Sequence, residues 1–112
     1  MMANKYRARR TTRGGRTYDS AKEARRAGEL RILERAGVIR NLREQVRYEL
    51  QGANGPIRYR SGRVAVYVAD FVYEDRDHGW ATVIEDVKGM DTPLSKLKRA
   101  IMEAQGFCVL LK

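Results

Sequence analysis

The sequence predicts a small α/β protein in which one mixed sheet is flanked by helices. Two segments have helical periodicity with capping residues, and four shorter segments have the composition of strands. A chain of 112 residues with 43% hydrophobic residues is large enough for a single core. The expected element order is α-β-β-β-α-β, within one domain.

Both predicted helices have clear start and stop signals. Ser20 is a suitable N-cap, and Glu23 follows at the spacing of a capping box. The first helix should run to about Ala36, with Ala27, Leu30 and Leu33 on its apolar side, and Glu23 should project within the same arc. The second should begin at Thr92-Pro93 and end at Gly106, with an apolar stripe and a separate basic side. That stripe comprises Leu94, Leu97, Ile101 and Met102, and the basic side comprises Lys96, Lys98 and Arg99.

The strand signals lie mainly between the helices. Residues 46–50 alternate as a half-exposed strand does, and residues 63–74 are apolar on both faces, as in a central strand. Residues 51–62, with three glycines and a proline, should form a loop or irregular hairpin. A third strand, 80–88, follows the turn 75–79 so closely that it should pair antiparallel with the second. A short fourth strand is expected at 107–111.

Charge predicts a polyanionic partner, either nucleic acid or an anionic membrane surface. We expect no membrane partner, because the N-terminal residues lack the large apolar side chains that an interfacial helix needs. Lys and Arg number 23 against 14 Asp and Glu, which gives a net charge of +9. Residues 1–18 should be a basic flexible arm that ends in a short strand near residues 16–18, and residues 19–112 should be the domain. The arm either contacts DNA phosphates or is a solubilising tail. The cations of this arm are Lys5, Arg7, Arg9, Arg10, Arg13 and Arg16. The chain has neither a membrane-spanning apolar run nor a signal-peptide core, so we expect a cytoplasmic protein, in the host cytoplasm if a phage encodes it.

Three charged residues on neighbouring strands suggest chemistry at a phosphate. Asp70 interrupts the most apolar strand, where an unpaired carboxylate is costly. Asp86 and Lys88 share one face of the next strand, and Asp70 should fall opposite about residue 84, diagonally close to Asp86. Two carboxylates could bind Mg²⁺, and the lysine could orient the attacking water. The alternative is a structural ion pair between Asp and Lys. If the strand were bulged, Glu85 would be the acidic ligand in place of Asp86.

These residues resemble the PD-(D/E)XK nuclease superfamily. The matching segments are Ser20–Ala24, Ala69–Phe71 and Glu85–Gly89, and the element order agrees with the superfamily's restriction-endonuclease-like core. No proline precedes Asp70, and the second acid is Asp where Glu is commoner. Residues 4–8 and 34–39 also resemble a family of small phage proteins, described only as a domain of unknown function, with a Holliday-junction-resolvase-like core.

The resemblance implies a metal-dependent endodeoxyribonuclease that acts on DNA, including branched DNA such as Holliday junctions. Asp70, Asp86 and Glu23 would contact Mg²⁺, for which Mn²⁺ could substitute, and Lys88 would assist the water. A non-catalytic basic nucleic-acid-binding protein is the alternative. Two symmetric cuts need two sites, so we expect a homodimer. Its contact surface could include Phe107, Val109 and residues 110–112.

Overall fold

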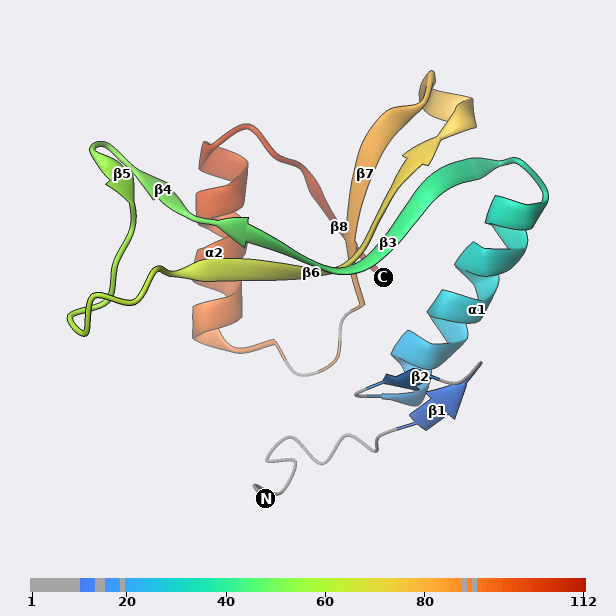
Figure 1. Ribbon diagram of the computed structural model, residues 1–112, viewed down its shortest axis with the longest axis horizontal. Coiled ribbons are helices and arrows are strands. Elements are labelled where there is room, and N and C mark those ends of the chain that lie inside the picture. Colours follow the sequence, from blue (N-terminus) through green and yellow to red (C-terminus); the bar gives the residue numbers. More distant parts are fainter. Residues whose placement is uncertain (1–10, 14–15, 19, 88, 90) are drawn as a thin grey trace.

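The computed structural model has the predicted mixed α/β architecture, a four-stranded sheet flanked by two helices (Figure 1). It describes residues 11–13, 16–18, 20–87, 89 and 91–112. The strands are β1 (Thr11–Arg13), β2 (Arg16–Tyr18), β3 (Ile39–Glu49), β4 (Gln51–Gly52), β5 (Gly55–Pro56), β6 (Val66–Asp75), β7 (Ala81–Asp86) and β8 (Val109–Leu111). The helices are α1 (Ala21–Arg35), the short 3-10 helix η1 (Arg76–His78) and α2 (Pro93–Ala104).

The sheet has the strand order β3-β6-β7-β8. The β3–β6 and β6–β7 pairs are antiparallel, whereas β7 and β8 are parallel and are connected through α2. The predicted order α-β-β-β-α-β is therefore confirmed for α1, β3, β6, β7, α2 and β8. The hairpins β1–β2 and β4–β5 are additional.

Strand β3 is much longer than the sequence indicates. It begins at Ile39, whereas only residues 46–50 have clear period-two alternation. Two residues within it, Asn41 and Gln45, have φ values of 56° and 54°, and the pairing with β6 shifts register between Arg40 and Arg43. These irregularities conceal the strand periodicity of its first half.

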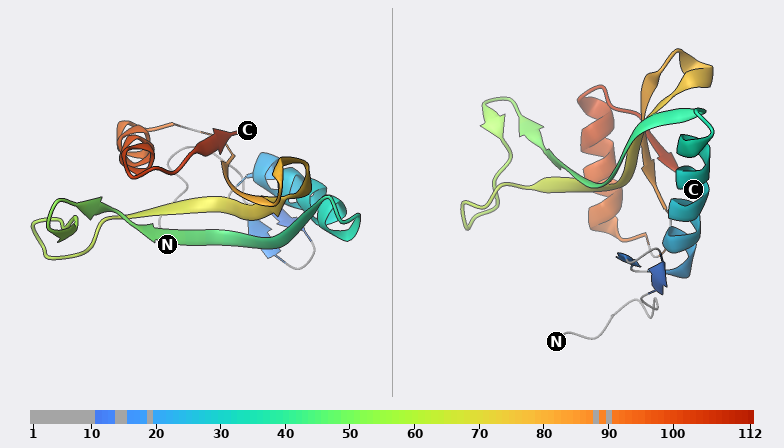
Figure 2. Two further views of the ribbon diagram at one scale, coloured as in Figure 1. Left: turned by 90° about the horizontal axis from the view of Figure 1, so that it is seen from above. Right: turned by 45° about the vertical axis from the view of Figure 1, so that its right-hand side comes forward.

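Two apolar clusters support the sheet. One contains residues of α1, including Ala27 and Leu30, together with Phe71 of β6. The other contains Met102 of α2 and Ala69 of β6. Figure 2 shows β3 and β6 as one long, bent ribbon with α1 beside one part of it and α2 beside another. Asp70 lies in the chain between Ala69 and Phe71, at the boundary of the two clusters.

Helix α2 does not bury the apolar stripe that the sequence predicts. Met102 is fully buried, but Leu94 and Leu97 are 52% and 57% exposed. The half-buried residues Lys98 and Arg99 lie near Met102 on the helix circumference. The expectation of an inward stripe is thus wrong for the two leucines, because α2 turns part of its basic side toward the sheet.

Both ends of the described chain contain short strands. Strand β2 lies where the sequence predicts a short strand near residues 16–18, it pairs with the additional strand β1, and Tyr18 is buried against α1. Val109 packs against the second cluster, whereas Leu110 and Leu111 are exposed on the terminal strand of the sheet. The homodimer through this strand stays a prediction. No described helix could span a membrane.

Candidate functional site

Glu23 is held at the start of α1 by a well-formed helix N-terminus. The Ser20 hydroxyl accepts a hydrogen bond from the Glu23 backbone N–H at 3.1 Å, so Ser20 is the N-cap that the sequence predicts. The Glu23 side chain itself is only 7% exposed. Its Oε2 accepts a hydrogen bond from Nε2 of Gln45 at 3.0 Å. The backbone of Glu23 therefore takes part in the helix cap, whereas its carboxylate faces β3.

Asp70 and Asp86 lie directly across from each other on β6 and β7. Phe71 is paired with Glu85 and Val72 with Ile84, so the next position along this register places Asp70 opposite Asp86. The predicted partner, residue 84, is wrong by two positions. The connection occupies residues 76–80 and not 75–79, since Asp75 is still paired with Ala81. The correction brings the two aspartates closer than the diagonal arrangement expected from the sequence.

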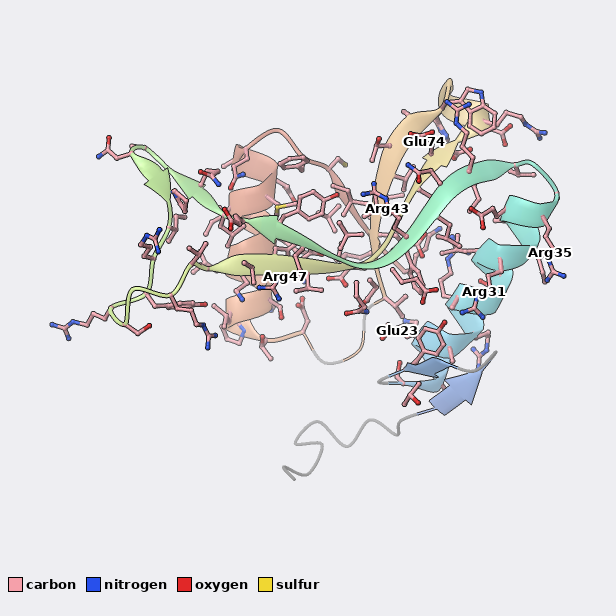
Figure 3. The ribbon with its side chains drawn as sticks, in the orientation of Figure 1. Glu23, Arg31, Arg35, Arg43, Arg47 and Glu74 are labelled. Atoms are coloured by element: carbon pink, nitrogen blue, oxygen red, sulfur yellow. The ribbon has the colours of Figure 1, made fainter. Side chains whose placement is uncertain are left out.

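Each aspartate has a fixed hydrogen-bond donor. Asp70 Oδ2 accepts from the Val87 backbone N–H at 2.8 Å, and its Oδ1 accepts from Gln45 Nε2 at 3.3 Å. Asp86 Oδ2 accepts from the Tyr67 hydroxyl at 2.8 Å. Figure 3 shows Glu23 at the beginning of α1, close to the bent β3–β6 ribbon. Gln45, which contacts both Glu23 and Asp70, connects the helix to the strand pair.

The electrostatics of Asp70 are those of a crowded carboxylate. Burial, the adjacent Asp86 carboxyl group and the charge of Glu23 together raise the pKa of Asp70 to about 8, although the Val87 N–H opposes the shift. Burial, and then Asp86, also raise the pKa of Tyr67 well above its usual range, so Tyr67 remains a hydrogen-bond donor. The arrangement disfavours negative charge in the absence of a cation and would favour binding one.

This crowding predicts a pH-dependent effect on stability. An Asp whose folded-state pKa is raised favours the fold at low pH, and this contribution is lost as pH rises from about 4 to about 8. In chelator, Asp70→Asn should therefore be more stable than wild type at pH 8, by on the order of 1 kcal/mol, with the difference shrinking toward pH 4. Urea unfolding of both proteins across this pH range measures the difference. A constant difference would contradict the repulsion.

Glu85 is not part of this cluster. Its side chain is fully buried and accepts hydrogen bonds from Arg26 Nε at 2.6 Å, Arg26 Nη2 at 2.8 Å and the Tyr73 hydroxyl at 2.8 Å. Burial of the Tyr73 hydroxyl, and then its hydrogen bond to Glu85, raise the pKa of Tyr73 to about 12. Because these partners occupy both carboxylate oxygens, Asp86 is the acid of this strand that is available beside Asp70.

Sequence reasoning missed several residues around the aspartates. Gln45 has no motif, and its one distinctive property, a left-handed backbone within a strand, is visible only in the structure. Tyr67 could have been noticed, because it precedes Asp70 by three residues in the same apolar strand. Arg99 of α2 is held by both oxygens of Asp91, at 2.9 and 2.7 Å, and Asp86 contributes to its raised pKa. It therefore brings positive charge to the Asp86 side of the site.

The donor set fits Mg²⁺ through its aspartate pair. Mg²⁺ takes oxygen ligands and commonly binds one or two protein carboxylates, with water and phosphate completing its octahedron. Among the described residues, no three His, Cys, Asp or Glu side chains are gathered as a ready metal-binding group. The adjacent carboxyl groups of Asp70 and Asp86 are thus the two direct ligands that the site could supply, with Glu23 at its edge.

Several of the predicted functional residues cannot be placed. Lys88 and the arm residues Lys5, Arg7, Arg9 and Arg10 lie outside the described part of the chain. The backbones of Arg13 and Arg16 are paired in the β1–β2 hairpin. Of the predicted site, the structure therefore pairs Asp70 with Asp86 and connects Glu23 to Asp70 through Gln45.

Comparison with known proteins identifies a family but no activity. No curated protein and no solved structure matches the chain significantly. A family model described as a protein of unknown function, DUF1064, matches residues 3–110. Since this match covers nearly the whole chain, the protein belongs to the DUF1064 family.

Proposed function

We propose that this protein is a Mg²⁺-dependent endonuclease that hydrolyses DNA phosphodiester bonds. The observation that carries the proposal is the pair of aspartates, Asp70 and Asp86, opposite each other on adjacent strands with Glu23 alongside. The arrangement agrees with the resemblance to PD-(D/E)XK nucleases. The net charge of +9 supports a polyanionic substrate.

In this proposal the two aspartates hold the metal, and their neighbours orient them. The Val87 N–H fixes one oxygen of Asp70, whose other oxygen contacts Gln45, and the Tyr67 hydroxyl fixes one oxygen of Asp86. The carboxyl groups of Asp70 and Asp86 are within hydrogen-bond distance of each other. Bound Mg²⁺ would lower the pKa of a water molecule and stabilise charge on the phosphate. Lys88 would orient that water, and Glu23 would stand at the outer edge of the site.

A direct test incubates the full chain with supercoiled, linear and four-way-junction DNA in Mg²⁺, Mn²⁺ or chelator. We expect nicked or cut products in Mg²⁺ and Mn²⁺ and none in chelator, with the three substrates reporting whether branched DNA is preferred. DNA binding without cleavage under every metal condition would instead favour the second candidate, a basic nucleic-acid-binding protein. The basic surface supports that candidate equally, but the crowded aspartates do not.

The proposal also includes a homodimer, since one site cuts one strand in each encounter and a twofold pair would place a site on each strand. Exposed apolar residues on α2 and β8 support such a contact, because a subunit interface would remove their apolar surface from water. They are Leu94, Leu97, Leu110 and Leu111.

A further inference from the structure

A second basic feature lies away from the aspartates, on the hairpin extension that we call the wing, residues 50–65. It contains β4, β5 and the loop that leads into β6, and Figure 1 shows it projecting beyond the end of the β3–β6 ribbon. Leu50 and Ala65 are buried at its base. The backbone N–H of Leu50 donates to Ala65 O at 3.0 Å. The wing is therefore an integral extension of the sheet.

The wing helps to form a cavity of about 400 Å³ with β3 and α2. Three cations from three elements line it: Arg47 of β3, Arg63 of the wing and Lys98 of α2. None of the three forms a salt bridge with a residue in the described part of the chain, whereas Arg26, Arg31, Arg40 and Arg99 all do. Residues 50–69 contain no Asp or Glu. The cavity therefore concentrates uncompensated positive charge.

An aromatic ring completes the lining. Tyr59 is 40% exposed, and the guanidinium of Arg63 lies over its ring at 5.9 Å from the centroid. The turn that carries both is held by hydrogen bonds from Tyr59 N–H to Arg63 O at 2.8 Å and from Gly62 N–H to Tyr59 O at 2.9 Å. Arg58 Nη1 donates to Gly62 O at 2.8 Å. These hydrogen bonds fix the backbone of the turn from which the Tyr59 ring and the Arg63 side chain project.

We infer that this cavity binds a single strand of DNA, with a phosphate among Arg47, Arg63 and Lys98 and a base stacked on Tyr59. Cations that follow a phosphate backbone beside an exposed aromatic ring are the common means of holding unpaired nucleotides. Arg47 lies two residues from Gln45 on β3, or about 7 Å of extended chain, so a strand bound here leads toward the aspartates. Figure 3 shows Arg47 between Glu23 and the wing.

This inference deepens the proposed function and relies on it for the choice of DNA as the polyanion. The inference explains why Lys98 of α2 lines the cavity, since a lysine has no role in packing an apolar core. It also gives the enzyme a preference for DNA that carries an unpaired strand, because a base within a duplex has no free face to stack on Tyr59.

The test measures fluorescence anisotropy of labelled DNA in chelator, so that binding is followed without cleavage. The probes are a single-stranded 20-mer, a blunt duplex and a duplex with splayed ends. The variants are Arg63→Gln/Lys98→Gln, Tyr59→Leu and Tyr59→Phe. Arg35→Gln/Arg76→Gln is the charge-matched control, since both arginines are exposed and neither lines the cavity. Figure 3 shows Arg35 at the far end of α1. Thermal unfolding checks that every variant is folded.

The double variant should bind single-stranded DNA about tenfold more weakly, and its slope of log K against log salt should fall by about 1.4. Tyr59→Leu should weaken binding of the single strand and the splayed duplex about tenfold, without changing blunt-duplex binding; Tyr59→Phe should bind normally. Wild-type binding by the Arg63→Gln/Lys98→Gln variant, or an equal loss in Arg35→Gln/Arg76→Gln, would overturn the inference. So would displacement of the single strand by poly-glutamate of equal charge. If the wing binds as expected and no condition gives cleavage, only the nuclease proposal fails.

Discussion

Asp70→Asn and Asp86→Asn should each reduce DNA cleavage at least about a thousandfold while leaving the protein folded. Each substitution removes a charged ligand from a pair that would share one Mg²⁺, and metal-site ligands contribute several kcal/mol to the transition state. Asn keeps a carbonyl oxygen, so residue 70 can still accept the Val87 N–H and residue 86 the Tyr67 hydroxyl. The loss should therefore be chemical and not structural.

Initial rates of nicking on supercoiled DNA, with enzyme in excess, provide the measurement. The double variant should be scarcely slower than either single variant, since ligands of one metal act as a unit. Glu23→Gln should reduce the rate less, because Glu23 lies at the edge of the pair. Asp77→Asn is the matched control, as Asp77 lies in the exposed turn η1. If Asp86→Asn remained active while a folded Glu85→Gln did not, Glu85 would be the metal ligand.

Much of the fold could be predicted from the sequence because local signals and tertiary packing agree. Ser20 and Thr92 are the N-caps of the two helices, as their positions before helical patterns indicate. The strand around Asp70 reads as central because it is apolar on both faces, and it is central in the sheet. Asp70 was identifiable for the same reason, since a carboxylate within such a strand needs a compensating role.

The remaining features depend on interactions that no local pattern encodes. The register of β6 and β7 is set by which residues form the turn. Because the turn lies one residue later than expected, at residues 76–80, Asp70 falls opposite Asp86 and not opposite residue 84. The left-handed backbone of Gln45 is stabilised by tertiary contacts with Glu23 and Asp70. The helical periodicity of α2 identifies which of its residues are on the apolar side. Periodicity alone does not determine which side of the helix packs against the sheet.

Arg26 shows how the candidate site is anchored to the fold. It lies on α1 one turn after Glu23, and its guanidinium holds the fully buried Glu85, the residue next to Asp86. Glu85 raises the pKa of Arg26 further above its ordinary value, against the effect of burial. The pair therefore joins the helix that carries one acid of the site to the strand that carries another. Breaking it should affect both stability and the geometry of the acids.

We expect Arg26→Met to lower the free energy of unfolding by about 3–5 kcal/mol, because it leaves the Glu85 carboxylate buried without its cation. The melting temperature should fall by more than about 10 °C. Arg25→Met is the matched control, since Arg25 is the preceding residue on α1 and is exposed. Urea unfolding of both variants in chelator measures the difference without any contribution from bound metal.

The double variant Arg26→Met/Glu85→Met separates the pair's own energy from the penalty of an orphaned charge. With both charges gone, the Tyr73 hydroxyl loses its partner Glu85, and the exposed Glu29 loses its ion pair with Arg26 but stays hydrated. At least about 2 kcal/mol of the stability should therefore return. A double-mutant cycle then gives the coupling energy directly. If Arg26→Met were as stable as Arg25→Met, the Arg26–Glu85 pair would contribute nothing to the stability of the fold. The anchoring of α1 to β7 through this pair would then be wrong.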